Sequence, residues 1–156
     1  STDLVADKII KHDPALLLID VRSPDQYEEF SLPGALNIPL ENILDEEWKD
    51  YFLAEDFDIV LFSNDEVYAD QAWILLRRLN YKNLRVMQGG LNHWAETILQ
   101  PPVPSQSAPQ EAFELYDFRR AANQDFGGGS GEIQPVETET IQVTRKKKKS
   151  AVEGGC

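Results

Sequence analysis

A serine stands where a nucleophile would be most useful in this chain. Ser63 follows the apolar run Asp58-Ile59-Val60-Leu61-Phe62 and precedes a predicted helix. The first turn of a helix has unpaired backbone N–H groups and a partial positive charge, which suit a nucleophile or a bound anion. The side chain here is a hydroxyl, and Asn64-Asp65-Glu66-Val67-Tyr68 continue with two carboxylates and neither glycine nor arginine. The segment therefore has the position of a catalytic loop but lacks reactive groups.

Ser63 could still be a serine nucleophile if a base lay within hydrogen-bond reach. The two histidines, His12 and His93, lie in other segments, so a serine that caps the loop or the helix is the simpler interpretation. Asp65 and Glu66 are explained as surface acids favoured by the helix dipole, with a divalent ion as the weaker alternative. The sequence predicts no cofactor and no metal site.

The first 100 residues alternate between strand and helix patterns. Leu4, Val5, Ile9 and Ile10 mark a first helix, and Ser23-Pro24 start a second, short one. Strands are predicted at 16–19, 35–38, 57–62 and 84–87, and further helices at 41–51, 68–79 and 91–99. In helix 68–79 the side chains of Ala72, Trp73, Leu75, Leu76 and Leu79 are expected to face inward. This order predicts an α/β fold, a parallel sheet with helices on both faces.

Glycine and proline mark the predicted domain boundaries. We expect a domain at 1–100, a proline-rich linker at 101–111, an amphipathic helix at 112–126 and a disordered tail, rich in glycine and lysine, at 127–156. The helix at 112–126 could dock on the domain or be presented to a partner. The chain begins with Ser1 rather than Met, so we expect a fragment or a processed product, and the sequence assigns no compartment.

Charge and composition exclude several functions. The net charge is −12, and residues 1–100 hold 19 acidic and 8 basic side chains. Such a surface repels nucleic acids and anionic membranes, and no apolar run is long enough to span a bilayer. The one cysteine, Cys156, excludes an internal disulfide and a cysteine-based metal site. We therefore expect the partner to be another protein or another domain of a longer chain.

Two further motifs give the sequence a specific resemblance. Leu18-Ile19-Asp20-Val21-Arg22 and the segment Tyr27 to Pro39 resemble the opening signature of the rhodanese-homology family, and Gln88-Gly89-Gly90-Leu91-Asn92-His93-Trp94 resembles its closing signature. The resemblance covers roughly residues 3–100. Active members are sulfurtransferases whose cysteine opens a loop of the type Cys-Arg-x-Gly-x-Arg. The resemblance implies that Ser63 takes the cysteine position and that Asn64, Glu66 and Tyr68 replace the arginine, glycine and second arginine; Ser31 stands where the family often has histidine.

Three functional hypotheses follow from this resemblance. The first is a catalytically inactive rhodanese-like domain that acts as an interaction or regulatory module. The alternative is a sulfurtransferase or sulfur carrier that uses Cys156 or a cysteine outside this fragment, although an incidental cysteine at a flexible end is the simpler interpretation of Cys156. A third hypothesis, a phosphatase of the related fold, needs the same absent cysteine and arginine.

Overall fold

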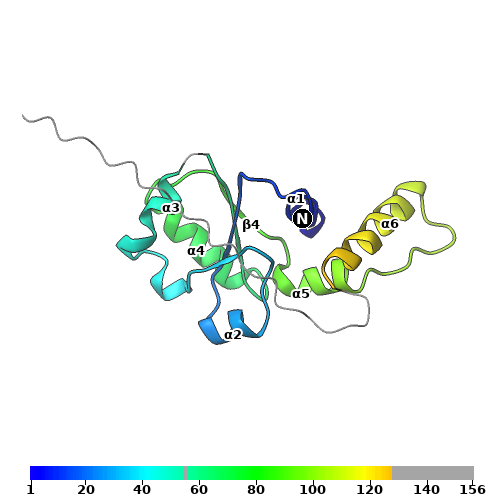
Figure 1. Ribbon diagram of the computed structural model, residues 1–156, viewed down its shortest axis with the longest axis horizontal. Helices are drawn as coiled ribbons and strands as arrows, with labels where there is room; N and C mark the ends of the chain where they lie inside the picture. The colour runs from blue at the N-terminus through cyan, green and yellow to red at the C-terminus, as the bar shows by residue number, and fades with distance from the viewer. Residues whose placement is uncertain (55, 128–156) are drawn as a thin grey trace, which may run out of the picture.

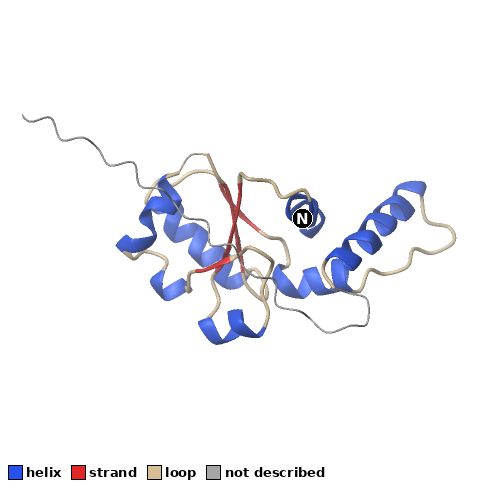
Figure 2. Ribbon diagram, in the orientation of Figure 1, coloured by secondary structure: helices blue, strands red, loops and turns tan. Residues whose placement is uncertain are grey.

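The sheet has four parallel strands in the order β2-β1-β3-β4. The structure is a computed structural model that describes residues 1–54 and 56–127. Its strands are β1 (Leu16–Asp20), β2 (Leu36–Asn37), β3 (Asp58–Phe62) and β4 (Leu84–Val86). β1 pairs with both β2 and β3, and the strands lie at the centre of the molecule, between the helices (Figure 2). The predicted α/β fold with an all-parallel sheet is confirmed.

Helices cover both faces of this sheet. α1, α5 and α6 lie on one side of the strands and α3 and α4 on the other (Figure 1). The helical segments are α1 (Thr2–Ile10), α2 (Pro24–Glu29), the 3-10 turns η1 (Leu40–Asn42) and η2 (Glu46–Trp48), α3 (Lys49–Leu53), α4 (Val67–Arg78), α5 (Gly90–Trp94), the π-helical turn η3 (Ala95–Leu99) and α6 (Gln110–Asp125).

The strands bury apolar side chains on both faces because each face is covered. Leu18, Val60 and Phe62 belong to the core beneath α1, α5 and α6. Leu17 and Leu61, from the same strands, belong to the core beneath α3 and α4. Burying one such side chain contributes roughly 1.5–3 kcal/mol, so the continuous apolar runs hold the strands at the centre of the molecule.

The single helix expected at 41–51 is wrong. The segment forms η1, η2 and α3 instead, and the backbone of Asp45 is extended, with φ −65° and ψ 142°. The side-chain amide of Asn42 donates to the Asp45 carboxylate at 2.9 Å. Asn and Asp offer the backbone such local alternatives to a helix, which explains the interruption and leaves Leu44 half exposed.

The inward face predicted for helix 68–79 is only partly correct. α4 buries Ala69, Ala72 and Leu76, whereas Trp73 is 37% and Leu79 55% exposed. The buried positions recur every three or four residues, and Trp73 lies beside that stripe while Leu79 caps the helix end. The Trp73 indole N–H donates to the backbone carbonyl of Leu84 at 3.2 Å, so Trp73 packs at the rim.

α6 docks on the domain. The Arg119 guanidinium donates to both carboxylate oxygens of Asp3 in α1, at 2.6 and 2.9 Å. The Asn123 amide donates to the carbonyls of Ile98 and Leu99 in η3. The ring of Phe126, just beyond the helix, meets Trp94 edge to face at 5.1 Å. Of the two alternatives for this helix, docking on the outer helices is therefore the one observed.

The Asp3–Arg119 pair should make stability depend on pH. Hydrogen bonds from Arg119 hold the pKa of Asp3 below its ordinary value of 3.8, although burial acts in the opposite direction. Since the folded pKa is the lower one, the stabilisation is complete above the unfolded pKa and is lost as pH falls through the folded pKa. We expect Asp3→Asn to lower the free energy of unfolding by about 1–2 kcal/mol at neutral pH.

Urea denaturation at several pH values measures this effect. The difference between Asp3→Asn and the unsubstituted protein should shrink as the pH falls below 3.8. Asp7→Asn is the matched control, because the Asp7–Lys11 pair on the same helix is exposed and worth about 0.5 kcal/mol or less. A pH-independent difference would contradict the assigned ion pair.

Candidate functional site

Ser63 lies between the end of β3 and the start of α4 and is buried, with 1% of its surface exposed. Its hydroxyl donates to the backbone carbonyl of Asp65 at 2.6 Å and accepts from the backbone N–H of Ala69 at 3.4 Å. Both of these partners are backbone groups, and neither is a histidine that could act as a base. The Nδ1 atom of His93 lies 3.7 Å from a carboxylate oxygen of Glu96. The Ser63 hydroxyl thus caps its own loop and the first turn of α4.

The acidic side chains that follow Ser63 are also engaged. The Asp65 carboxylate accepts from the backbone N–H of Val67 at 2.9 Å. The Glu66 carboxylate accepts from the backbone N–H of Gly89 at 2.8 Å, while Val67 and Tyr68 are more than half exposed. The backbone N–H groups of Val67 and Ala69, at the start of α4, are therefore occupied by oxygens of the loop itself. An incoming anion would have to displace them.

The start of α5 holds the other side of the loop. The backbone N–H groups of Leu91 and Asn92 donate to the carbonyls of Ser63 and Asn64, both at 2.9 Å. These bonds bring the loop carbonyls so close that a Cβ on Gly90 would lie 2.5–2.7 Å from the carbonyl oxygens of Ser63, Asn64 and Asp65. Gly90 also has φ +59°. Gly90 belongs to the closing motif of the sequence, but the support that it gives to the loop could not be seen from that motif.

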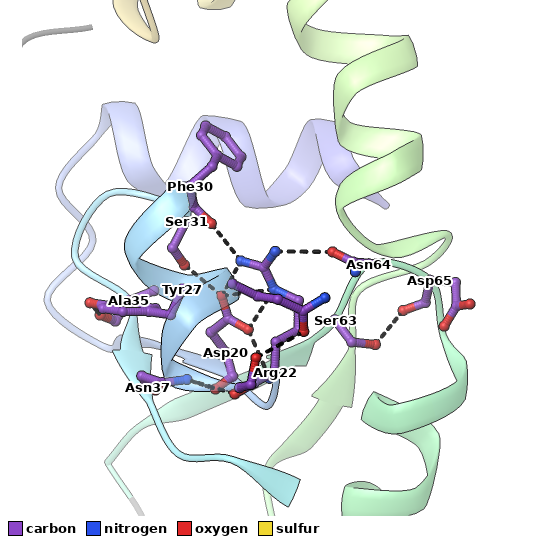
Figure 3. Close-up of polar contacts among 12 residues, drawn as sticks. Asp20, Arg22, Tyr27, Phe30, Ser31, Ala35, Asn37, Ser63, Asn64 and Asp65 are labelled. Carbon is purple, nitrogen blue, oxygen red and sulfur yellow. Dashed lines mark hydrogen bonds and ion pairs between the residues drawn. The ribbon is translucent and has the colours of Figure 1, made fainter.

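A buried ion pair braces the end of β1 beside the loop (Figure 3). Asp20 is fully buried and Arg22 nearly so. The Arg22 guanidinium donates to Asp20 through Nε at 3.0 Å and Nη2 at 2.7 Å, and the Arg22 backbone N–H adds a bond at 3.0 Å. The Ser31 hydroxyl donates to the same carboxylate at 2.8 Å. Both buried charges are thus neutralised and hydrogen-bonded, as burial requires.

Arg22 also ties this pair to the loop. Its Nη1 donates to the side-chain oxygen of Asn64 at 3.0 Å, and Nη2 donates to the backbone carbonyl of Phe30. The end of α2 and the Ser63 loop therefore lie on either side of one guanidinium (Figure 3). The bond from Arg22 to Asn64 could not be predicted from the sequence, because residues 42 positions apart leave no local pattern.

Two more polar side chains fix the turn after α2. The Asn37 amide donates to the backbone carbonyls of Asp20 and Arg22, both at 3.0 Å. The Tyr27 hydroxyl donates to the carbonyl of Ala35 at 2.7 Å, and burial raises the pKa of Tyr27. β1, β2 and α2 thus form a rigid support for Arg22.

The charge around the loop is negative. The loop itself, residues 63–68, has two acidic side chains and no basic one. The Arg22 guanidinium is committed to Asp20, Asn64 and Phe30, whereas Asp65 and Glu66 are exposed at the loop. This electrostatic environment disfavours a small anion such as thiosulfate.

The family follows from comparison with known proteins. The family model described as the rhodanese-like domain matches residues 1–97 of this chain. The chain belongs to the rhodanese-like family.

Several curated relatives are larger proteins. The chain is 30% identical over 108 residues to the adenylyltransferase and sulfurtransferase UBA4 of Scheffersomyces stipitis, covering 64% of this chain and 24% of that protein. It is 32% identical over 93 residues to the adenylyltransferase and sulfurtransferase MOCS3 of Drosophila virilis, covering 55% and 20%. It is also 30% identical over 115 residues to the centrosomal protein of 41 kDa B of Xenopus laevis, covering 62% and 32%. The chain thus spans about a third or less of the length of these relatives.

Solved structures show the same fold. The Alr3790 protein from Anabaena superimposes with a TM-score of 0.55 at 21% identity, covering 79% of this chain and 91% of that one. The BH2092 protein from Bacillus halodurans gives 0.53 at 22% identity, covering 60% and 67%.

Three sequence predictions concern a thiol, a membrane and sulfur transfer. Cys156 lies outside the described residues, so the structure does not place it. None of the helices within 1–54 and 56–127 has the length and apolar character needed to cross a bilayer. Relatives named as sulfurtransferases fit the hypothesis of sulfur transfer better than that of an inactive regulatory module.

Proposed function

We propose that this chain is a rhodanese domain whose Ser63 loop does not itself carry sulfur, and that any sulfur it transfers is held by a thiol outside that loop. The observation that supports the proposal most strongly is the buried Ser63 hydroxyl, which is hydrogen-bonded to Asp65 and Ala69 of its own loop. Where the resemblance expects a reactive cysteine, the chain has an alcohol.

The chemistry of persulfide transfer supports this proposal. A thiolate accepts sulfane sulfur as a persulfide and passes it to a second nucleophile. The serine hydroxyl is not appreciably ionised at neutral pH, and an oxygen-bound analogue would not be a competent carrier. A thiosulfate about 5 Å from Asp65 or Glu66 would in addition meet roughly 3 kcal/mol of repulsion per charge pair at an effective dielectric near 20.

Sulfur transfer with a thiol from elsewhere is the first candidate role. The thiol would be Cys156 or a cysteine in another part of a longer protein, and the relatives named as sulfurtransferases favour this role. Their greater length supports a partner that is another domain or another protein.

A binding module without sulfur transfer is the second candidate role. It is supported by the self-capped loop and by one relative that is named as a centrosomal protein and not as an enzyme.

A thiosulfate:cyanide sulfurtransferase assay on the full chain tests the proposal. We expect no thiocyanate above the buffer rate if the chain is a binding module. Turnover that Cys156→Ser abolishes would assign the sulfur to the terminal thiol. Turnover that persists in Cys156→Ser would contradict the proposal, because the core then transfers sulfur without a cysteine.

Restoring a thiol in the loop should not restore activity. We expect Ser63→Cys, in a Cys156→Ser background, to stay within about tenfold of the buffer rate, because Asp65 and Glu66 still repel the donor and Arg22 stays bound to Asn64. Initial rates of thiocyanate formation measure this. Robust turnover from this single change would show that the remaining loop residues are compatible with sulfur transfer.

A further inference from the structure

A groove lies on the α3–α4 side of the molecule, away from the Ser63 loop. α4 begins at the loop and is 12 residues long, about 18 Å, and the groove lies at its far end. Two adjoining cavities of about 330 and 200 Å³ form the groove and share Phe52 and Tyr81 in their linings. The groove is therefore a surface feature distinct from the Ser63 loop.

Apolar side chains form the floor and the rims of this groove. Phe52 is buried at its base, and its ring lies 5.6 Å from that of Tyr81. Three leucines in the lining are exposed: Leu44 by 50%, Leu53 by 56% and Leu79 by 55%. Leu44 and Leu53 belong to one wall and Leu79 to the other. Such a concentration of exposed leucines is typical of a surface that another protein covers.

The two walls carry opposite charge. The acidic wall, residues 41–53, has five carboxylates and one cation, Lys49, which lies 3.4 Å from Glu46. The basic wall, residues 79–83, has Lys82 and no acidic residue. Asp45, Glu46 and Lys49 line the first cavity and Lys82 lines the second.

We propose that this groove is the interface of a homodimer formed by a second copy of the chain. A two-fold axis that runs along the groove places the acidic wall of each copy against the basic wall of the other, and Leu44 and Leu53 of one copy onto Leu79 of the other. A partner of one charge would be attracted by one wall and repelled by the other, whereas an identical chain satisfies both. This interface does not depend on the function proposed for the Ser63 loop.

Sedimentation velocity of the full chain over a range of concentrations tests the proposal. Reductant is present so that Cys156 cannot form an intermolecular disulfide. We expect a reversible monomer–dimer equilibrium, with Leu79→Asp raising the dimer Kd by roughly tenfold or more. Leu115→Asp is the matched control, because Leu115 is 39% exposed on α6 and should leave Kd unchanged. Circular dichroism shows that each variant is folded.

A charge exchange tests the pairing of the walls. Glu46→Lys and Lys82→Glu should each weaken self-association, because like charges then face each other. An equimolar mixture of the two variants should form heterodimers, since every reversed side chain then meets an opposite charge. A chain that stays monomeric at all concentrations, equal effects of Leu79→Asp and Leu115→Asp, or a mixture no stronger than its components would overturn the proposal.

Discussion

Arg22→Met should destabilise the protein by about 3–5 kcal/mol. The substitution leaves the Asp20 carboxylate fully buried without its counter-ion, and an uncompensated buried charge costs this much. It also releases the Asn64 side chain and the Phe30 carbonyl, so the Ser63 loop loses a support. Urea denaturation followed by circular dichroism measures the change.

Arg85→Met is the matched control. Arg85 also pairs with an aspartate, Asp58, but its side chain is 66% exposed, so its loss should cost about 1 kcal/mol or less. If Arg22→Met does not fold, Arg22→Met combined with Asp20→Leu should recover much of the stability, since it removes both charges. A single Arg22→Met change that costs less than 1 kcal/mol would contradict the buried pair.

Gly90→Ala should destabilise the protein by about 3 kcal/mol or more. The new methyl would overlap three backbone carbonyl oxygens of the loop, at 2.5–2.7 Å, and these oxygens cannot move freely because Leu91 and Asn92 bind two of them. A positive φ of +59° adds about 1–2 kcal/mol of backbone strain for a residue with a side chain. Overpacking of a rigid site contributes a further 1–3 kcal/mol or so.

Gly34→Ala separates these two contributions. Gly34 has φ +75° in the turn after α2, but a Cβ there would meet no atom within 4 Å. We therefore expect only the conformational cost, about 1–2 kcal/mol. Equal losses for both alanine variants in thermal and urea unfolding would show that the close approach of the loop to Gly90 has no energetic consequence.

The strands and helices that depend on local sequence patterns could be predicted from the sequence. Apolar runs such as 16–19 predicted buried parallel strands, because strands covered on both faces need apolar side chains at every position. The helix at 41–51 could not be excluded by periodicity, because Asn42 and Asp45 break it through a side-chain contact. Helix propensity alone does not take such a side-chain contact into account.

The position of the site could be predicted from the sequence, but the contacts that support its loop could not. Ser63 follows an apolar run and precedes a helix, and both features lie within a few residues of one another. The bond from Arg22 to Asn64 and the approach of Gly90 to the loop carbonyls join distant segments, so only the folded chain reveals them. α6 likewise contacts α1 across more than a hundred residues.

Intact-mass and peptide mass spectrometry after treatment with a persulfide donor most directly tests whether the loop carries sulfur. The terminal thiol is first blocked by alkylation. We predict that the rest of the chain keeps its unmodified mass, because the Ser63 hydroxyl is buried, hydrogen-bonded and flanked by carboxylates. A sulfur adduct that maps to residues 63–68 would contradict this account.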